Sequence, residues 1–212
     1  MTTELAFANI VGVMVAPLPF YIREDDPPAK REILRAAMKL FSEGGLADTS
    51  IRDIAKESGY TNPALYKHFA SKEELALHLF ETSHQRVWSK CAAAMASKKD
   101  FDGKVDAYIH QWLTFIDEYP DVFAFLSDSA RVLWPKASPR VRQQTMISLA
   151  YCLIAEASQV RRSTSTVNPH LAAASLQGTL AELARMIQVG VVKGPATRWK
   201  VDLVALLKKI VT

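Results

Sequence analysis

The sequence predicts an all-α protein on the strength of three observations. Apolar residues recur at helical spacing from Pro27 onward, and no stretch sustains the two-residue alternation of a β-strand. Residues typical of helix ends separate the apolar stretches. The 212 residues are 49% apolar and 23% charged, which is the composition of a globular protein with one large domain or two small ones.

Helix-capping patterns divide the first half of the chain into four predicted helices. Asp26 is placed as the cap of the first. Ser50 with Asp53, and Ser71 with Glu74, have the spacing in which a hydroxyl and a carboxylate cap the same helix end. The predicted helices cover residues 27–43, 51–58, 61–68 and 72–95.

Five further helices are expected in the second half of the chain. Pro120 begins the second of these, and Gly194 with Pro195 precedes the last. A polar linker is expected over residues 163–168. The predicted helices cover residues 104–119, 120–134, 139–162, 170–189 and about 199–210.

Charge and cysteine content restrict the classes of function. The net charge of +4 and the pI of 9.0 permit a polyanionic partner. Two cysteines give no disulfide framework and indicate a reducing compartment, so we expect a cytoplasmic protein. The uncharged run from Leu5 to Phe20 is too short to span a membrane, and no basic segment precedes it. We expect residues 1–25 to be a mobile or partner-docked extension.

Residues 51–68 have the pattern of a helix-turn-helix. Gly59 provides the positive φ that a sharp turn needs, and the small Ala55 lets the second helix cross closely. Ile54, Tyr60 and Leu65 are predicted to form the apolar wedge between the two helices. Residues 30–72 contain eight Lys and Arg against five Asp and Glu, and no acidic residue lies between Tyr60 and Lys72. Such a surface suits a phosphate backbone.

These residues carry a family resemblance. The segments TSIRDIAKESGY (49–60), NPALYKHF (62–69) and SKEEL (71–75) resemble the DNA-binding domain of the tetracycline-repressor (TetR) family. The resemblance covers about residues 30–80, and the segment before Asp26 is longer than is usual in the family. It implies a homodimer whose recognition helices enter successive major grooves of a near-palindromic operator, about 34–36 Å apart. With the N-terminal extension (1–25) set apart, the resemblance implies two further regions: a helix-turn-helix domain (26–72), from which the long helix continues to about residue 95, and a helical ligand-binding and dimerisation domain (73–212).

The resemblance assigns candidate DNA contacts by position. Arg52 is matched to guanine, and Asn62 to adenine or a phosphate. Lys72, at the start of the long helix, is expected to contact the DNA backbone. The complete set of expected contacts is Ser50, Arg52, Thr61, Asn62, Pro63, Ala64, Tyr66, Lys67, His68 and Lys72.

The C-terminal half supplies candidates for an effector site and a dimer interface. Aromatic stripes at helical spacing are more often core than pocket, but a cavity between bundle helices is a usual ligand site. The candidate effector contacts are Tyr108, Trp112, Phe115, Phe123, Met146, Leu149 and Cys152. Small residues that allow close backbone approach, with apolar residues of the last helix, give the candidate dimer contacts Ala174, Gly178, Ala181, Leu203 and Leu207.

The sequence therefore predicts a ligand-responsive transcriptional repressor that a small, mostly apolar effector releases from DNA. We expect no catalytic residues, metal or cofactor, because the five histidines are scattered and no phosphate-binding glycine loop is present. Two alternatives stay open. One is a dimeric small-molecule or partner-protein binder that no longer binds DNA specifically, and the other is a helical enzyme that uses the aromatic cavity.

Overall fold

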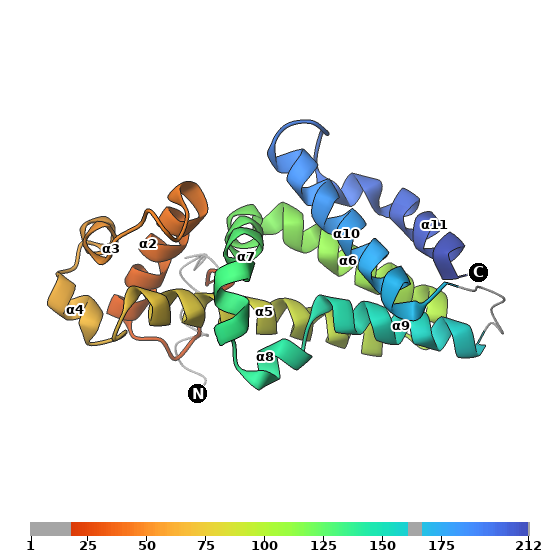
Figure 1. Ribbon diagram of the computed structural model, residues 1–212, viewed down its shortest axis with the longest axis horizontal. Helices are drawn as coiled ribbons and strands as arrows, with labels where there is room; N and C mark the ends of the chain where they lie inside the picture. Colours follow the sequence, from red (N-terminus) through yellow and green to blue (C-terminus); the bar gives the residue numbers. More distant parts are fainter. Residues whose placement is uncertain (1–17, 161–166, 212) are drawn as a thin grey trace, which may run out of the picture.

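The computed structural model describes residues 18–160 and 167–211. These residues form ten α-helices and two short 3-10 helices without any strand, which confirms the predicted all-α fold (Figure 1). The elements are α2 (Pro28–Gly44), α3 (Ile51–Ser58), α4 (Asn62–Tyr66), α5 (Lys72–Ala96), α6 (Phe101–Glu118), α7 (Pro120–Leu133), η1 (Trp134–Lys136), α8 (Pro139–Gln143), α9 (Met146–Val160), α10 (Pro169–Gln188), η2 (Ala196–Trp199) and α11 (Lys200–Val211). No helix in these ranges is long and apolar enough to cross a membrane.

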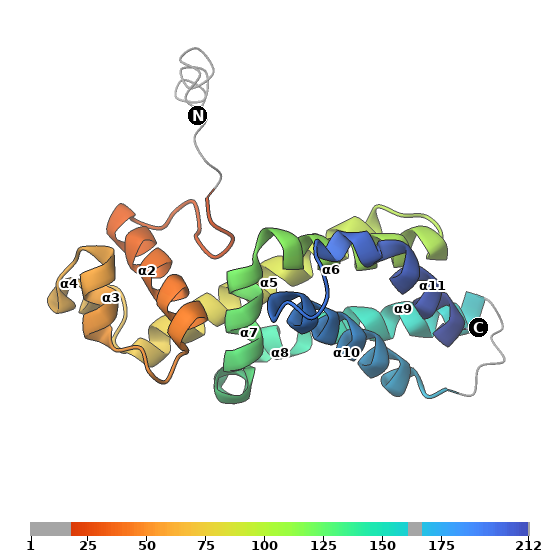
Figure 2. The same cartoon turned by 90° about the horizontal axis from the view of Figure 1, so that it is seen from above.

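The helices α2, α3 and α4 form a small unit at one end of an elongated molecule, and α5 runs from it into a larger helical bundle (Figures 1 and 2). Helix α2 packs against both α5 and α7. The ring of Phe41 on α2 stacks on Phe125 of α7, with 5.7 Å between the centroids, and Phe125 also meets Phe80 of α5. One continuous apolar core therefore joins the small unit to the bundle.

Two helix pairs dominate the larger bundle. Helix α5 lies along α6, and α9 lies along α10. Helix α11 closes the bundle against α6, where the carboxylate of Asp117 accepts hydrogen bonds from the backbone N–H groups of Ala196 and Thr197. This carboxylate fixes the loop that leads into α11.

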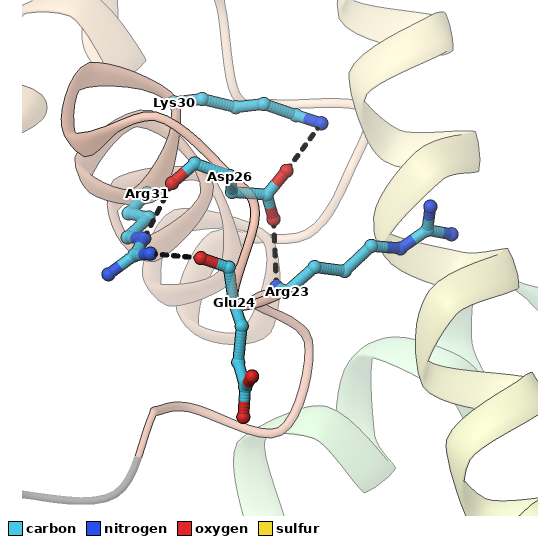
Figure 3. A network of polar contacts seen from close by, with 5 residues as sticks. All are labelled: Arg23, Glu24, Asp26, Lys30 and Arg31. Carbon is cyan, nitrogen blue, oxygen red and sulfur yellow. Dashed lines mark hydrogen bonds and ion pairs between the residues drawn. The ribbon is translucent and has the colours of Figure 1, made fainter. Parts of the chain in front are cut away.

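The start of α2 differs from the prediction. The N-cap is Pro27, which has no side-chain hydrogen bond to the helix, and Asp26 is not the cap. The Asp26 carboxylate instead accepts from the backbone N–H of Arg23 at 2.8 Å and pairs with the Lys30 ammonium at 2.7 Å (Figure 3). Burial raises the pKa of Asp26, but these two partners outweigh it and hold that pKa below its usual value. Asp26 therefore fixes the chain that leads into α2.

The single helix expected over residues 139–162 is also wrong. The helix breaks at Gln144, where ψ is 75°, and the segment becomes α8 and α9. Thr145 and Ser148 exchange side-chain hydrogen bonds with each other's backbone N–H groups at the start of α9. This reciprocal capping begins a new helix in a stretch whose apolar spacing alone looks continuous. Arg161, Arg162 and most of the predicted linker lie outside the described residues.

Residues 18–26 pack against the bundle, whereas an extension was expected up to residue 25. Phe20 and Ile22 are buried, and Arg86 of α5 donates a hydrogen bond to the Phe20 carbonyl oxygen at 2.5 Å. Arg31 of α2 donates to the carbonyl oxygens of Asp26 and Glu24 (Figure 3). We call residues 18–26 the N-terminal strap, because they bind the small unit to the bundle. Residues 1–17 lie outside the described residues.

Candidate DNA-binding surface and effector cavity

Helices α3 and α4 are positioned by local capping and by one glycine. The Ser50 hydroxyl accepts from the Asp53 N–H, and the Asp53 carboxylate accepts from the Ser50 N–H, which is the reciprocal capping expected from the sequence. Gly59 ends α3 with φ at 74°, in the left-handed region. The turn therefore has the form that the helix-turn-helix prediction requires.

The predicted wedge is only partly correct. Ile54 and Leu65 are buried at 0% and 1% exposure and pack in the core between the helices. Tyr60 is 36% exposed, so its ring is on the surface beside α4 and not in the wedge. Its backbone N–H bonds to the Ala55 carbonyl, which holds Tyr60 in the turn. Sequence reasoning assigned Tyr60 to the core because its aromatic side chain fits either environment.

Most of the expected DNA contacts are accessible. Residues Asn62, Ala64, His68 and Lys72 are half-buried, and the exposed ones are Ser50, Arg52, Thr61, Pro63, Tyr66 and Lys67. Tyr66 is 54% exposed and presents a large aromatic side chain to solvent.

Three cations on this surface make no ion pair among the described residues, although hydrogen bonds from Ser50 and, after them, the charge of Lys56 lower the pKa of Asp53. Arg52, Lys56 and Lys67 are exposed and make no ion pair there, whereas Lys39 on the neighbouring α2 pairs with Glu57 at 2.6 Å. Sequence reasoning did not single out Lys56, although its place on the same short helix as Arg52 was a usable signal. Unpaired cations on one face are what a polyanion needs.

Lys72 lies where the resemblance puts it but has a different set of partners. Its ammonium donates to the carbonyl oxygens of Leu46, Ala47 and Thr49, at 2.7, 3.3 and 2.7 Å. An ammonium group has three N–H donors, so these contacts occupy all of them. In the DNA-free chain these contacts make Lys72 a clamp for the loop before α3, and the expected phosphate contact stays a prediction.

A cavity of about 290 Å³ opens between α5, α6, α7, α10 and the start of α9. Four of the seven expected effector contacts line it: Trp112, Phe115, Phe123 and Met146. The other lining residues are His84, Val87, Leu126, Ser127, Ala130, Trp134, Thr145, Ile147, Gln177 and Ala181. Its walls are therefore mostly apolar and aromatic, as is usual for a small-molecule site.

Three expected effector contacts do not line this cavity. Tyr108 is fully buried, and its hydroxyl group lies 3.1 Å from both the Met146 carbonyl oxygen and Gln177 Oε1. Leu149 packs against the core, and Cys152 is exposed. The cavity meets only the start of α9, at residues 145–147, so Leu149 and Cys152, further along the same helix, lie outside it.

The polar lining residues that sequence reasoning missed are His84, Gln177, Ser127 and Thr145. Burial lowers the pKa of His84 to about 4, so its imidazole is neutral at pH 7. Its ring packs edge-on against Phe80 and Trp134. No short motif contains this cavity, because its lining comes from segments more than ninety positions apart, such as His84 and Gln177.

The expected dimer contacts divide into three groups. Ala174 and Gly178 are exposed on α10, whereas Leu203 and Leu207 are buried at 5% and 0% within the protomer itself, although Leu203 also lines the groove between α10 and α11. Ala181 lines the effector cavity.

Other apolar residues of α10 and α11 are exposed. Leu171, Val201 and Leu206 are 65%, 78% and 39% exposed. A groove between the helices, lined by Gly178, Leu183 and Leu206 among others, has a volume of about 580 Å³. We call this surface the α10–α11 face.

The comparisons with known proteins agree with this geometry. Residues 33–79, which include α3, α4 and the start of α5, match the family described as "Bacterial regulatory proteins, tetR family". The nucleoid occlusion factor SlmA of Marinobacter nauticus is 30% identical over 104 residues, which are 49% of this chain and 53% of SlmA. The transcriptional repressor KstR2 of Rhodococcus jostii is also 30% identical over 104 residues, 49% of this chain and 51% of KstR2. The chain thus spans about half the length of these relatives.

Solved structures extend the likeness of fold beyond the helix-turn-helix. The transcriptional regulator FadR from Bacillus subtilis, solved in complex with stearoyl-CoA, superimposes with a TM-score of 0.67 at 16% identity. The match covers 83% of this chain and 96% of FadR. At that identity the likeness establishes the shared fold of the whole helical protein.

Proposed function

We propose that this chain, whose helix-turn-helix domain belongs to the TetR family of bacterial regulatory proteins, is a homodimeric transcriptional repressor released from its operator by a small effector. The observation that carries the proposal is the surface of α3 and α4, where Arg52 and Lys67 are exposed without acidic partners among the described residues. No acidic residue lies between Tyr60 and Lys72 in the sequence. Such a surface attracts phosphates and leaves side chains free to reach base edges.

The DNA contacts divide by chemistry. Arg52 suits the two acceptors of guanine, and Asn62 suits adenine or a nearby phosphate. Lys67, with the hydroxyl groups of Thr61 and Tyr66, suits the backbone. Pro63 and Ala64 offer apolar contact to a thymine methyl group, and His68 lies at the end of the same segment. The Ser50 hydroxyl is already bonded to the Asp53 carboxylate at 2.5 Å, so we assign Ser50 to helix capping.

Two copies would associate through the α10–α11 face. Its exposed leucines and valines have no cover among the described residues, and Ala174 and Gly178 allow the backbones of facing helices to approach closely. A two-fold axis through this face repeats the same surface on both copies. It leaves α3 and α4 at the outer ends, where each copy can meet one half-site of a near-palindromic operator.

Effector binding would be transmitted by the elements that wall the cavity. His84 and Val87 of α5 line it, and α5 begins inside the DNA-binding unit at Lys72. Helix α7, which contributes Phe123 and Leu126, packs directly on α2. An effector that binds one arrangement of α5 and α7 more tightly would therefore shift the separation of the recognition helices.

The test is a selection of genomic fragments by the purified full chain at two salt concentrations. We expect a near-palindromic site whose affinity falls steeply as salt rises. Asn62→Ala should then lose about 1–3 kcal/mol at one base pair of each half-site, with unchanged binding to random DNA. Gln188→Ala is the matched control, because Gln188 is an exposed neutral amide at the end of α10, off α3 and α4.

The other outcomes contradict the proposal in different ways. Salt-sensitive binding without sequence preference would indicate an architectural DNA-binding protein. Failure to bind DNA at low salt, repeated after unfolding and refolding to remove any co-purified ligand, would leave a small-molecule or partner-protein binder. Turnover of a bound compound would establish an enzyme.

A further inference from the structure

The lining of the effector cavity is uncharged. It contains Trp, Phe, Leu, Val and Met side chains with a few neutral polar groups, and no Lys, Arg, Asp or Glu among its described residues. The one titratable side chain, His84, is neutral at pH 7 because burial depresses its pKa. A charged group that entered this cavity would lose its hydration without gaining an opposite charge, which weakens its binding.

Gln177 supplies an oriented polar group in this lining. The hydroxyl oxygen of Tyr108 lies 3.1 Å from Gln177 Oε1 and 3.1 Å from the Met146 carbonyl oxygen, so its single hydrogen is shared between these two acceptors. Tyr108 is fully buried, so its hydroxyl group contacts the Gln177 amide from within the protein core. An amide carries two donors and one acceptor. The Tyr108 contact occupies one end of the amide, and the other end remains available to a molecule in the cavity.

Resting on the proposed effector site, we propose that the effector is an uncharged, largely apolar ring compound with one carbonyl or hydroxyl group that hydrogen-bonds to Gln177. The side chains of Trp112, Phe115, Phe123 and Trp134 form the largely apolar walls that would contact its rings. Carboxylates and phosphates are the classes that this lining rejects. A coenzyme A thioester such as the stearoyl-CoA in the FadR complex carries phosphate charges and differs from the class assigned here.

Three probes with the same rings and different polar ends test the proposal: 2-acetonaphthone, 2-naphthoate and naphthalene. Each is titrated into the full chain at pH 7.5 by calorimetry, without DNA. We expect 2-acetonaphthone to bind at least tenfold more tightly than 2-naphthoate, since the carboxylate is desolvated without a cation. It should also bind about fivefold to tenfold more tightly than naphthalene, because a net hydrogen bond contributes that much.

Gln177→Leu is the diagnostic variant. It keeps the volume of the side chain and leaves the Tyr108 hydroxyl bonded to the Met146 carbonyl oxygen, so the variant is expected to fold. Gln177→Leu should bring 2-acetonaphthone to within about threefold of naphthalene while the affinity for naphthalene is kept. Gln188→Leu, on the exposed end of the same helix, is the control and should change none of the three affinities.

Three results would overturn the proposal. They are equal or tighter binding of 2-naphthoate, an unchanged ketone preference in a folded Gln177→Leu, and failure of all three probes to bind. Because DNA is absent from these titrations, they can fail while the operator selection succeeds. The reverse result, probe binding by a chain that does not bind DNA, would reject the repressor function and keep the ligand class.

Discussion

The ring of Phe20 packs 5.3 Å from the ring of Phe115, centroid to centroid, and Phe115 lines the effector cavity. Phe20 belongs to the N-terminal strap, and the strap continues through Asp26 into the ion pair with Lys30 on α2. Three links therefore join the cavity wall to the DNA-binding unit. They are the contact between Phe115 and Phe20, the strap itself, and the ion pair between Asp26 and Lys30. These links are separate from α5, which joins the same two regions through the backbone of one helix.

Phe20→Ala should destabilise the protein by about 3–5 kcal/mol, the usual cost of emptying a buried phenylalanine site. Phe20 is 4% exposed, and its ring also meets Tyr119 at 4.6 Å. Denaturant unfolding measures the loss. Tyr66→Ala, at a 54% exposed aromatic residue, should change stability by less than about 0.5 kcal/mol. Equal effects of the two substitutions would show that the strap adds nothing to the fold.

Two glycines near α3 should respond to alanine in opposite directions. Gly59 has φ at +74°, and no atom lies within 4 Å of a Cβ built on it, so Gly59→Ala should cost about 1–2 kcal/mol from backbone conformation alone. Gly44 is the last residue of α2 and also has open space around it. Gly44→Ala should stabilise by up to about 1 kcal/mol. Thermal unfolding of both variants checks the pair, and loss of stability in both would contradict the assigned geometry.

The sequence predicts those parts of the molecule whose signals are local. The capping by Ser50 and Asp53, the turn at Gly59 and the long helix from Ser71 depend on neighbours within four positions, and the structure has each of them. The family resemblance extends these signals to the whole helix-turn-helix because it rests on the same residues.

Features that depend on distant contacts could not be read from the sequence. Lys72 meets carbonyl groups more than twenty positions away, and Leu203 and Leu207 turn inward because α6 lies beside them. An apolar face at helical spacing looks the same whether it meets its own core or a second copy. The sequence predicted a mostly apolar effector cavity but not all of its lining residues, because Gln177 and His84 come together only in the folded chain.

Substitution of Lys72 should lower the stability of the fold, whereas substitution of Lys67 should change the salt dependence of DNA binding. Lys72→Met removes a donor group bonded to three carbonyl oxygens, so it should destabilise the fold by about 1–3 kcal/mol. Lys67→Met should leave stability within about 0.5 kcal/mol and lower the salt slope of DNA binding by about 1. The free energy of unfolding and the salt slope of DNA binding are measured for each of the two variants. A lowered slope in Lys72→Met would support its expected phosphate contact.

Leu206→Glu should dissociate the proposed dimer. Leu206 is 39% exposed and lines the groove of the α10–α11 face, so a second copy would bury the new carboxylate without a partner. Light scattering during size-exclusion chromatography measures the mass. Val132→Glu is the control, because Val132 is 51% exposed on α7, away from this face. A wild-type chain that is monomeric at micromolar concentration would reject the dimer outright.

The stability of the protein should fall as the pH drops from 6.5 to 4, and His84 should account for much of the loss. Burial lowers the pKa of His84 from 6.5 to about 4, so in this window the unfolded chain takes up a proton that the folded chain refuses. The shift corresponds to about 3 kcal/mol at pH 4 and to no change above pH 6.5.

The measurement is urea unfolding at half-unit steps of pH for the wild type and for His84→Phe, which preserves the aromatic contacts with Phe80 and Trp134. The variant should show a smaller loss of stability than the wild type over this window. The difference between the two curves isolates His84, because burial also lowers the pKa of His78 and both proteins share that contribution. Asp26 does not interfere, since its pKa lies below 3.8 and its stabilisation is lost only under more acidic conditions. Parallel curves for the two proteins would mean that the His84 imidazole is exposed to water in the folded protein. The part of the cavity wall that His84 forms would then be exposed to water as well.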